Sequence, residues 1–454
     1  MQKVLIANRG EIAVRIIRAC HDLGLQTVAV YSQADTEALH VLHADEAICI
    51  GEAPAIRSYL RIPNILSACE ITGADAIHPG YGFLSENANF ASICESCGLN
   101  FIGPSPASIS LLGDKAQAKS TAKAAGCPVI PGSDGVVADV KEALQEAKKL
   151  HYPIFIKAVA GGGGKGIRIA YTEEELIKQF PAARAEAVAS FGNPDVYLEK
   201  MIVNPRHVEV QILGDKQGNV VSLGERDCTI QRRRQKLIEE TPSPVLTLQQ
   251  RQRLGEAAVS VAKAAQYYSA GTVEFLLDEQ HRFYFMEVNT RIQVEHTVTE
   301  ELTGIDLVRE QIQIAQGKKL SFTQSDITFD GHVMQFRINA ENPSAHFAPS
   351  PGKLEYYLPP GGPHVRVDSA CYSGAVIPPF YDSMIAKLIV KGKDREEVVA
   401  IAKRALREFH IGGVHSTIPF HLYMLQDPRF LSGDYNLLYT DQLIAEGATF
   451  NQDH

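Results

Sequence analysis

Five polar side chains alternate with mostly apolar ones between Phe285 and His296. The polar series is Glu287, Asn289, Arg291, Gln293 and Glu295. Because successive side chains of an extended segment point to opposite faces, this spacing predicts one polar and one apolar face. A face that carries two acids, two carboxamides and a guanidinium could bind a metal ion or an anionic substrate. An ordinary solvated sheet edge is the alternative interpretation.

Another acid lies just upstream of this segment. Residues 270–277 and 282–286 each read as a β-run, and the residues between them favour a turn, which predicts a hairpin. Pairing across the hairpin can place Glu274 opposite Glu287, and two adjacent carboxylates repel unless a cation lies between them. Oxygen ligands from Glu274, Glu287 and Asn289 suit Mg²⁺ or Mn²⁺, so these are the predicted metal ligands.

A glycine-rich loop at residues 161–166 joins two more β-runs. The run before it, residues 152–158, contains Lys157, and residues 167–170 return as a strand. Glycines let backbone N–H groups close over phosphate oxygens, and Lys157 could neutralise them; a flexible turn is the alternative. A Walker A loop is excluded, because glycine and then a strand follow Lys165, where that motif requires Ser or Thr and a helix.

The N-terminal region alternates between strand and helix patterns. Strand-like residues 4–7, a helical period over residues 12–20 and strand-like residues 27–30 form one unit, and further units follow through residue 78. This pattern predicts an open α/β sheet. A dehydrogenase is a poor alternative, because residues 7–11 lack the G-x-G-x-x-G turn that contacts a dinucleotide.

Composition and charge exclude several classes of protein. The chain has 454 residues, 45% of them hydrophobic, which suffices for about three domains. A net charge of −9 and the lack of a long basic tract argue against nucleic-acid and membrane-surface partners. The sequence has no signal-peptide pattern and no apolar run of membrane length, so we expect a soluble, cytoplasmic protein. The eight cysteines fit free thiols, and Cys228 is the one expected near the site.

The glycine loop, its lysine and the acidic hairpin together resemble the ATP-grasp enzymes. Longer runs narrow the resemblance to biotin carboxylase and extend it over essentially the whole chain. These runs are residues 7–13, 78–87, 161–166, 225–233, 287–296, 337–341 and 381–384. The resemblance implies an α/β fold in three parts. They are a Rossmann-like N-terminal domain (1–113), an ATP-grasp domain (114–329) with a mobile lid at about 131–202, and a β-rich C-terminal domain (330–446).

The resemblance also implies ligands. ATP and two Mg²⁺ or Mn²⁺ ions are expected, with the metal on the three oxygen ligands named above. The family's ATP contacts fall on Lys115, Lys157, Gly163, Gly164, Lys165, Gly166, Glu199, Lys200, Ile202, His207, Gln231, Arg234, Leu276, Glu274 and Glu287. Arg234 departs from the family, whose members usually carry an uncharged polar residue or a histidine there. The added charge could tighten nucleotide binding or pair with a local acid.

The implied reaction carboxylates biotin. ATP activates bicarbonate to carboxyphosphate, which collapses to CO₂ for capture by a ureido nitrogen of biotin. The resemblance assigns the pocket for bicarbonate and biotin to Lys236, Arg291, Gln293, Val294, Glu295 and Arg337. Four of these are the expected catalytic residues: Glu295 as general base, Arg291 and Lys236 on bicarbonate, and Arg337 on the enolate form of biotin.

The resemblance also implies partners. No Met-Lys-Met or Met-Lys-Leu biotinylation site follows the C-terminal region. Biotin is therefore expected on a separate biotin carboxyl carrier protein, and separate carboxyltransferase subunits are expected to take the carboxyl group onward. A homodimer is implied as well. The expected assembly is acetyl-CoA carboxylase of fatty acid synthesis, with a two-subunit pyruvate or other acyl-CoA carboxylase as the alternative.

Two hypotheses of other kinds compete with a biotin carboxylase. An ATP-grasp ligase that acts on an amine would use the same metal pair but would not need biotin. A nucleotide-binding regulatory subunit with a dead site would be expected to lose metal ligands or the base. The chain retains Glu274, Glu287, Asn289 and Glu295, which argues against a dead site.

Overall fold

The computed structural model describes residues 1–159 and 166–450 as two compact units. The first unit is made of Met1–Cys127, Arg206–Phe275 and the chain from Glu287 onward; the second is made of Pro128–Pro205 and Leu276–Met286. The predicted ATP contacts Gly163, Gly164 and Lys165 lie outside the described residues. In the described part of the chain, no helix is long and apolar enough to cross a lipid bilayer.

The first unit begins with a five-stranded parallel sheet in the order β3-β2-β1-β4-β5. Its elements are β1 (Lys3–Ile6), α1 (Gly10–Asp22), β2 (Gln26–Ser32), η1 (Gln33–Asp35), α2 (Leu39–His43), β3 (Glu46–Gly51), η2 (Ala55–Arg57), α3 (Ile62–Thr72), β4 (Ala76–His78), α4 (Ala88–Ser96) and β5 (Asn100–Phe101). Helices α5 (Pro106–Gly113) and α6 (Lys115–Ala124) follow. Ile12, Ile16 and Ile17 of α1 are buried, as the helical period requires. The predicted open α/β sheet is confirmed.

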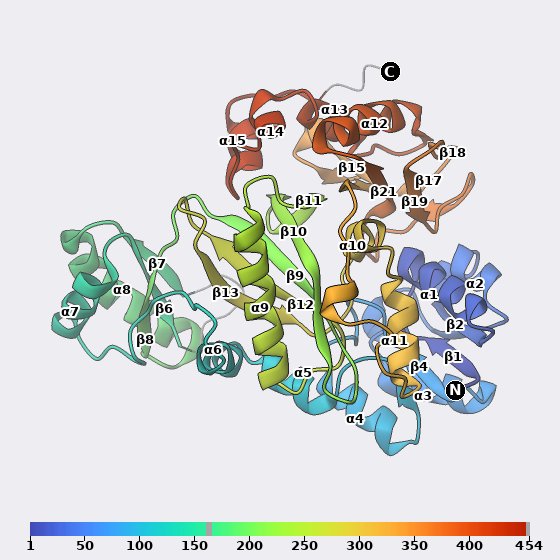
Figure 1. Ribbon diagram of the computed structural model, residues 1–454, viewed down its shortest axis with the longest axis horizontal. Coiled ribbons are helices and arrows are strands. Elements are labelled where there is room, and N and C mark those ends of the chain that lie inside the picture. The colour runs from blue at the N-terminus through green and yellow to red at the C-terminus, as the bar shows by residue number, and fades with distance from the viewer. Residues whose placement is uncertain (160–165, 451–454) are drawn as a thin grey trace. The chain divides into compact units, whose positions relative to one another are not determined.

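An eight-stranded sheet carries most of the predicted site residues. Its order is β13-β12-β9-β10-β11-β14-β21-β19. The strands are β9 (Arg206–Gly214), β10 (Val220–Arg232), β11 (Gln235–Thr241), β12 (Ser269–Leu277), β13 (Phe283–Asn289), β14 (His332–Asn339), β19 (Val365–Ser369) and β21 (Met384–Gly392). Helix α9 (Leu248–Ala264) packs on β9 and β10 (Figure 1). Because β12 and β13 are neighbours, the predicted hairpin is confirmed.

The same sheet continues across the boundary expected between residues 329 and 330. Strand β14 pairs antiparallel with β11 on one side, with Ile238 opposite Phe336, and with β21 on the other. These two residues belong to a core that also includes helix α12 (Arg395–Glu408). The three expected domains remain a prediction, since hydrogen bonds join the strands on either side of this boundary.

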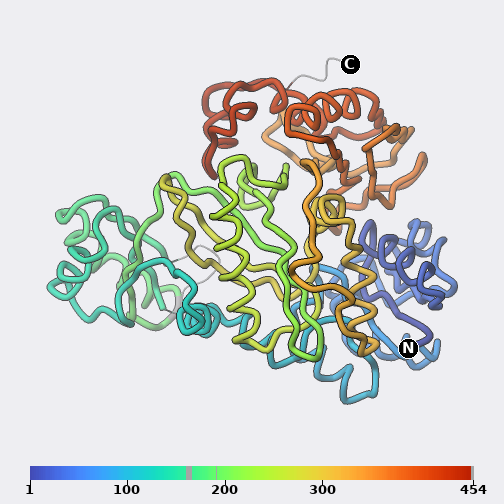
Figure 2. The backbone as a smooth tube through the Cα atoms, viewed as in Figure 1, coloured from blue at the N-terminus to red at the C-terminus, as the bar shows by residue number. Residues whose placement is uncertain are grey.

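Helices and short strands complete the first unit. They are α10 (His296–Thr303), α11 (Leu307–Ala315), η3 (Gln324–Asp326), β15 (Glu341–Asn342), η4 (Pro343–Ala345), β16 (Ala348–Pro349), β17 (Gly352–Lys353), β18 (Tyr356–Leu358), β20 (Val376–Ile377), β22 (His410–Gly412), α13 (Ile418–Met424), α14 (Pro428–Ser432) and α15 (Tyr439–Ala445). Helix α11 lies beside α1, which is far away in the sequence (Figure 2). Buried residues of both helices share one core.

The second unit has a three-stranded antiparallel sheet in the order β7-β6-β8. Its elements are α7 (Val140–Leu150), β6 (Ile154–Ala158), β7 (Ile167–Ala170), α8 (Glu173–Phe191) and β8 (Val196–Lys200). Strands β6 and β7 flank the glycine loop, as predicted. The lid expected at about residues 131–202 falls within this unit and remains a prediction.

The prediction of one extended segment through His296 is wrong beyond Asn289. Strand β13 ends at Asn289, a turn includes Val294, and α10 begins at His296. The neighbours Ile292 and Gln293 are both buried, which a strand with one polar and one apolar face would not allow. The backbone turns here because His296 Nδ1 lies 2.7 Å from the carbonyl oxygen of Gln293, closing the chain at the start of the helix.

Replacing Ile292 by alanine is expected to loosen this turn. The side chain of Ile292 is fully buried in the core shared by α1 and α11. Truncation should lower the free energy of unfolding by about 2–5 kcal/mol, because it leaves a cavity. Urea unfolding measures the loss. The control Ile71→Ala removes an exposed side chain, and equal effects of the two changes would contradict the packing described.

Acid should destabilise the fold partly through His421. Burial lowers the pKa of His421 to about 4, although its ring also hydrogen-bonds the carbonyl oxygen of Arg337. The unfolded imidazole gains a proton near pH 6.5, so stability falls as the pH drops from about 6.5 toward 4. From pH 7.5 to 5.5 the wild type should lose about 1.4 kcal/mol more than His421→Gln. Unfolding at both pH values tests this, and the exposed His364→Gln should keep the wild-type slope.

Candidate active site

A partly buried ammonium group is at the centre of the predicted site. Lys236 Nζ on β11 lies 2.5 Å from Glu209 Oε2, 2.5 Å from Glu295 Oε1 and 3.4 Å from Glu274 Oε1. Burial disfavours its charge, but Cys228 and these three carboxylates raise the pKa of Lys236 well above its ordinary value. The surrounding acids therefore favour the charged form of Lys236. Cys228 is close to the site, as predicted.

Glu295 is held as a carboxylate by two cations. Besides Lys236, Arg337 Nη2 on β14 donates to Glu295 Oε2 at 2.9 Å, while Arg337 Nε donates to the buried Glu239 at 2.6 Å. Burial opposes ionisation, but Lys236 and Arg337 outweigh it and lower the pKa of Glu295. A carboxylate is the form that can accept a proton, as a general base must.

The pKa values of the two hairpin acids shift in opposite directions. Burial opposes the charge of Glu274, but Lys236 and His207 hold the pKa of Glu274 well below its ordinary value. Burial and the neighbouring Glu274 raise the pKa of Glu287. Lys115 Nζ, on a side chain 87% exposed, lies 3.7 Å from Glu287 Oε2. The repulsion expected between the two carboxylates is therefore present.

The hairpin oxygens fit a hard divalent cation, with one qualification for Asn289. Its amide nitrogen donates to Glu274 Oε1 at 2.7 Å, and its oxygen accepts from Arg291 Nη2 at 3.1 Å. Glu274 and Glu287 offer the carboxylate oxygens that Mg²⁺ prefers. Asn289 now turns its amide nitrogen toward Glu274, so the amide must turn before its oxygen can share a cation with Glu274.

A second group of ligand atoms lies beside the first. His207, Glu209 and Glu274 bring one atom each to within 4.8 Å of one another. His207 Nε2 is 2.9 Å from Glu274 Oε2, and the predicted ATP contact Gln231 lies 3.4 Å from the other ring nitrogen. Lys236 already binds both acids, so a cation here would compete with its ammonium.

Arg291, Gln293 and Val294 are oriented by other parts of the first unit. Arg291 Nε donates to Glu86 Oε2 at 2.9 Å, and Gln293 Nε2 donates to Glu274 Oε1 at 2.8 Å. The carbonyl oxygen of Val294 accepts from the buried Lys387 at 3.2 Å. Of the six residues predicted to bind bicarbonate and biotin, these three and Glu295 lie in the irregular segment between β13 and α10.

The remaining predicted ATP contacts fall on both units. In the second unit, Lys157 on β6 forms an ion pair with Glu199 on β8, and Lys200 donates through Nζ to His151 O at 2.9 Å. Three further predicted ATP contacts of this unit are Gly166, whose φ is +75°, the buried Ile202, and Leu276 on β12. In the first unit, Arg234 is exposed at the tip of the β10–β11 hairpin, with φ +65°.

Four charged residues for which the sequence predicted no role complete the cluster. They are Glu86, Glu209, Arg226 and Glu239. Glu86 and Arg226 lie within runs that carry the family resemblance, so a signal was available for both. Glu209 and Glu239 lie on strands whose neighbouring side chains are also buried, and no periodic pattern marks them.

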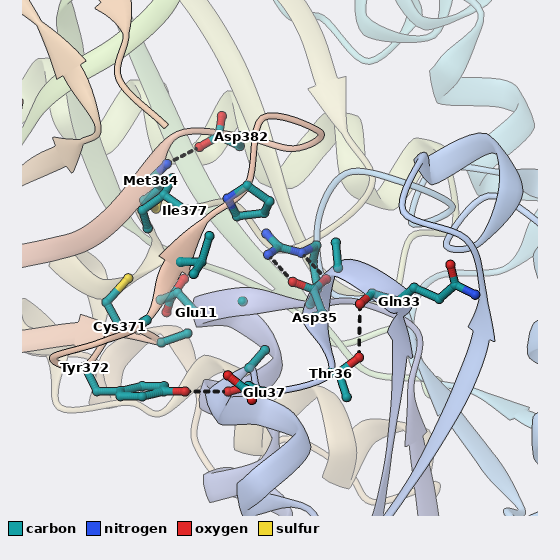
Figure 3. A pocket seen from close by; sticks show the side chains of 18 residues that line it. Glu11, Gln33, Asp35, Thr36, Glu37, Cys371, Tyr372, Ile377, Asp382 and Met384 are labelled. Atoms are coloured by element: carbon teal, nitrogen blue, oxygen red, sulfur yellow. Dashed lines mark hydrogen bonds and ion pairs between the residues drawn. The ribbon is translucent and has the colours of Figure 1, made fainter. Parts of the chain in front are cut away.

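A hollow of about 330 Å³ lies elsewhere in the first unit, between the loop after β2 and residues 370–378. Asp35, Glu37, Tyr372 and Asp382 surround it (Figure 3). The Tyr372 hydroxyl donates to the backbone oxygen of Glu37 at 2.7 Å, and Asp35 binds Arg9. None of the predicted site residues that the structure describes lines this hollow.

Family models match three consecutive parts of the chain. The biotin carboxylase N-terminal domain matches residues 1–109, the ATP-binding domain of the carbamoyl-phosphate synthase L chain matches residues 114–323, and the biotin carboxylase C-terminal domain matches residues 335–442. Together the three models span residues 1–442 with short gaps between them.

Similar proteins are known over the full length. Biotin carboxylase 1 of Bacillus subtilis is 58% identical, covering 97% of this chain and 98% of its own. A pyruvate carboxylase subunit of Methanothermobacter thermautotrophicus is 52% identical, over 97% and 89%. The biotin carboxylase domain dimer of Hydrogenobacter thermophilus 2-oxoglutarate carboxylase, in complex with MgADP, ADP and bicarbonate, is 50% identical, with a TM-score of 0.89 over 99% of both chains. This chain therefore belongs to the biotin carboxylase family of ATP-dependent ligases.

Proposed function

We propose that this chain carboxylates biotin on a separate biotin carboxyl carrier protein, as the first half-reaction of acetyl-CoA carboxylase. The observation that carries the proposal is the convergence of Lys236, Arg337 and Glu295, which places two cations on one ionised carboxylate. Such a site can hold an anion beside a base. Bicarbonate is the proposed anion, as in the H. thermophilus relative.

The proposed chemistry assigns each proton and bond. Arg291 and Lys236 hold bicarbonate, and Glu295 takes its proton so that an oxygen attacks the γ-phosphorus of ATP. ADP leaves and carboxyphosphate forms, then splits into CO₂ and phosphate. The phosphate accepts the ureido proton of biotin, Arg337 stabilises the resulting enolate, and its nitrogen attacks CO₂. Gln293 and Val294 complete the proposed pocket.

Metal and nucleotide sites follow from the same assignment. We propose Glu274 and Glu287, and Asn289 after its amide turns, as ligands of Mg²⁺ or Mn²⁺, which would offset the charge of the ATP phosphates. The proposed nucleotide contacts in the first unit are Lys115, His207, Gln231 and Arg234. Those in the second unit are Lys157, Gly166, Glu199, Lys200, Ile202 and Leu276, with Gly163, Gly164 and Lys165 of the loop.

The proposed assembly is a homodimer that works with separate carboxyltransferase subunits. The dimeric H. thermophilus relative supports the homodimer. Acetyl-CoA is the proposed final acceptor, and pyruvate is the alternative, because one relative belongs to a pyruvate carboxylase. Enzyme isolated from its own cells with its partners attached would decide between them: malonyl-CoA formation supports the first, and oxaloacetate formation the second.

Glu295→Gln tests the proposed base. With Mg²⁺, the wild-type protein should release ADP from ATP only when bicarbonate is present, and faster with free biotin. Glu295→Gln should lower this rate by about 10²–10³-fold, because the amide cannot take the proton of bicarbonate. The control Glu256→Gln changes an exposed glutamate of α9 and should match the wild type. ADP release independent of bicarbonate and biotin would instead favour an amine-using ligase.

Metal removal and Glu287→Gln test the cation site. EDTA should abolish ADP release, and added Mg²⁺ should restore it. Glu287→Gln should raise the half-saturating Mg²⁺ concentration by about tenfold or more, because an amide offers one neutral oxygen in place of a charged ligand. A titration of rate against Mg²⁺ measures the change, again with Glu256→Gln as control. An unchanged half-saturation would remove Glu287 from the proposed ligands.

A further inference from the structure

Arg226 on β10 is a fully buried arginine whose five N–H groups all have acceptors. Its exposed fraction is 0%. The acceptors are Glu209 Oε1 at 2.6 Å, Gln211 Oε1 at 2.6 Å, Thr299 Oγ1 at 3.0 Å, Thr272 Oγ1 at 3.1 Å and Gln293 Oε1 at 2.8 Å. A guanidinium has five donors in a fixed plane, so this environment satisfies it completely.

Two of the five acceptors belong to the proposed active site. Gln293 accepts from Arg226 through its oxygen and therefore presents its amide nitrogen to the other side, where it donates to Glu274 Oε1 at 2.8 Å. Glu209 accepts from Arg226 with one oxygen and from Lys236 with the other, at 2.5 Å. Arg226 thus fixes which end of the Gln293 amide faces the substrate side and where the Lys236 ammonium sits.

The other three acceptors fix Arg226 itself. Gln211 lies on β9, Thr272 on β12 and Thr299 on α10, so the guanidinium is held from three elements. Burying a charged guanidinium this deeply costs free energy unless each of its donors is paired. Lysine has three donors on a flexible stem and cannot replace the planar fork. A change at residue 226 should therefore reach Gln293 and Lys236 together.

We infer that Arg226 is a positioning residue for bicarbonate, which orients the Gln293 amide directly and the Lys236 ammonium through Glu209. This inference rests on the proposed function, because it takes Gln293 and Lys236 as bicarbonate contacts. Arg226 touches no substrate. Its effect should appear in the use of bicarbonate and leave ATP binding unchanged.

Arg226→Lys and Arg395→Lys form a matched pair of tests. Arg395 is also a largely buried arginine bonded to a buried carboxylate, Glu240, and to a backbone oxygen, Leu431 O, but it contacts no proposed site residue. Arg226→Lys should raise the KM for bicarbonate at least about tenfold, with the dissociation constant of ATP within about twofold of the wild type. Arg395→Lys should lower the melting temperature and leave both constants near wild-type values.

A double substitution tests the route of the effect. Gln293→Ala alone should raise the KM for bicarbonate. The double variant Arg226→Lys, Gln293→Ala should raise it by less than the product of the two single effects, because both changes remove the oriented Gln293 amide. Fully multiplicative effects would overturn the inference. So would an Arg226→Lys enzyme whose bicarbonate kinetics match those of Arg395→Lys.

Two further results keep the test decisive. If Arg226→Lys fails to fold, Thr272→Val replaces it, because this change removes one acceptor from the Arg226 nitrogen that also donates to Gln293. A rise of about threefold or more in the KM for bicarbonate supports the inference. No rise overturns it. Wild-type protein that releases ADP without needing bicarbonate would refute the proposed function. Wild-type dependence on bicarbonate together with an unaffected Arg226 variant would refute only the role of Arg226.

Discussion

The pairing of Lys236 with three carboxylates is the interaction on which the site depends. Glu209, Glu274 and Glu295 come from β9, β12 and the start of α10, and their mutual repulsion would separate these elements without a cation between them. Arg226 and Arg337 extend the same balance on either side. These ion pairs therefore add to the apolar packing that holds the elements around the site together.

The charges around the site shift the pKa values of its glutamates in different directions. Glu295 and Glu274 are kept ionised by adjacent cations, whereas Glu287 has a raised pKa beside Glu274. Glutamates with such different pKa values suit the different roles proposed above for them, a general base and cation ligands. Environment assigns these roles, and the residue type alone does not.

Local patterns predicted most of the fold, and long-range contacts explain the misses. The parallel N-terminal sheet, the acidic hairpin and the strands around the glycine loop were expected from short-range periodicity. The strand through His296 was wrong because alternation of residue types does not reveal that the chain turns after Asn289. Glu239 had no predicted role because Arg337 is distant in sequence and reaches it through the pairing of β11 with β14. Arg226 lies in a run that carries the family resemblance, but its acceptors come from β9, β12, α10 and the segment before α10, which local patterns do not bring together.

The strand that delivers Arg337 also closes an open edge. Strand β14 pairs with β11 from Ile238 to Thr241. A fragment ending at the expected domain boundary near residue 330 would lack Arg337, one of the two cations that bind Glu295. It would also expose a row of unpaired backbone groups beside buried apolar side chains. Unprotected edges of this kind recruit strands from other molecules. The strand that supplies Arg337 to the proposed site thus also protects the edge of β11 from pairing with other molecules.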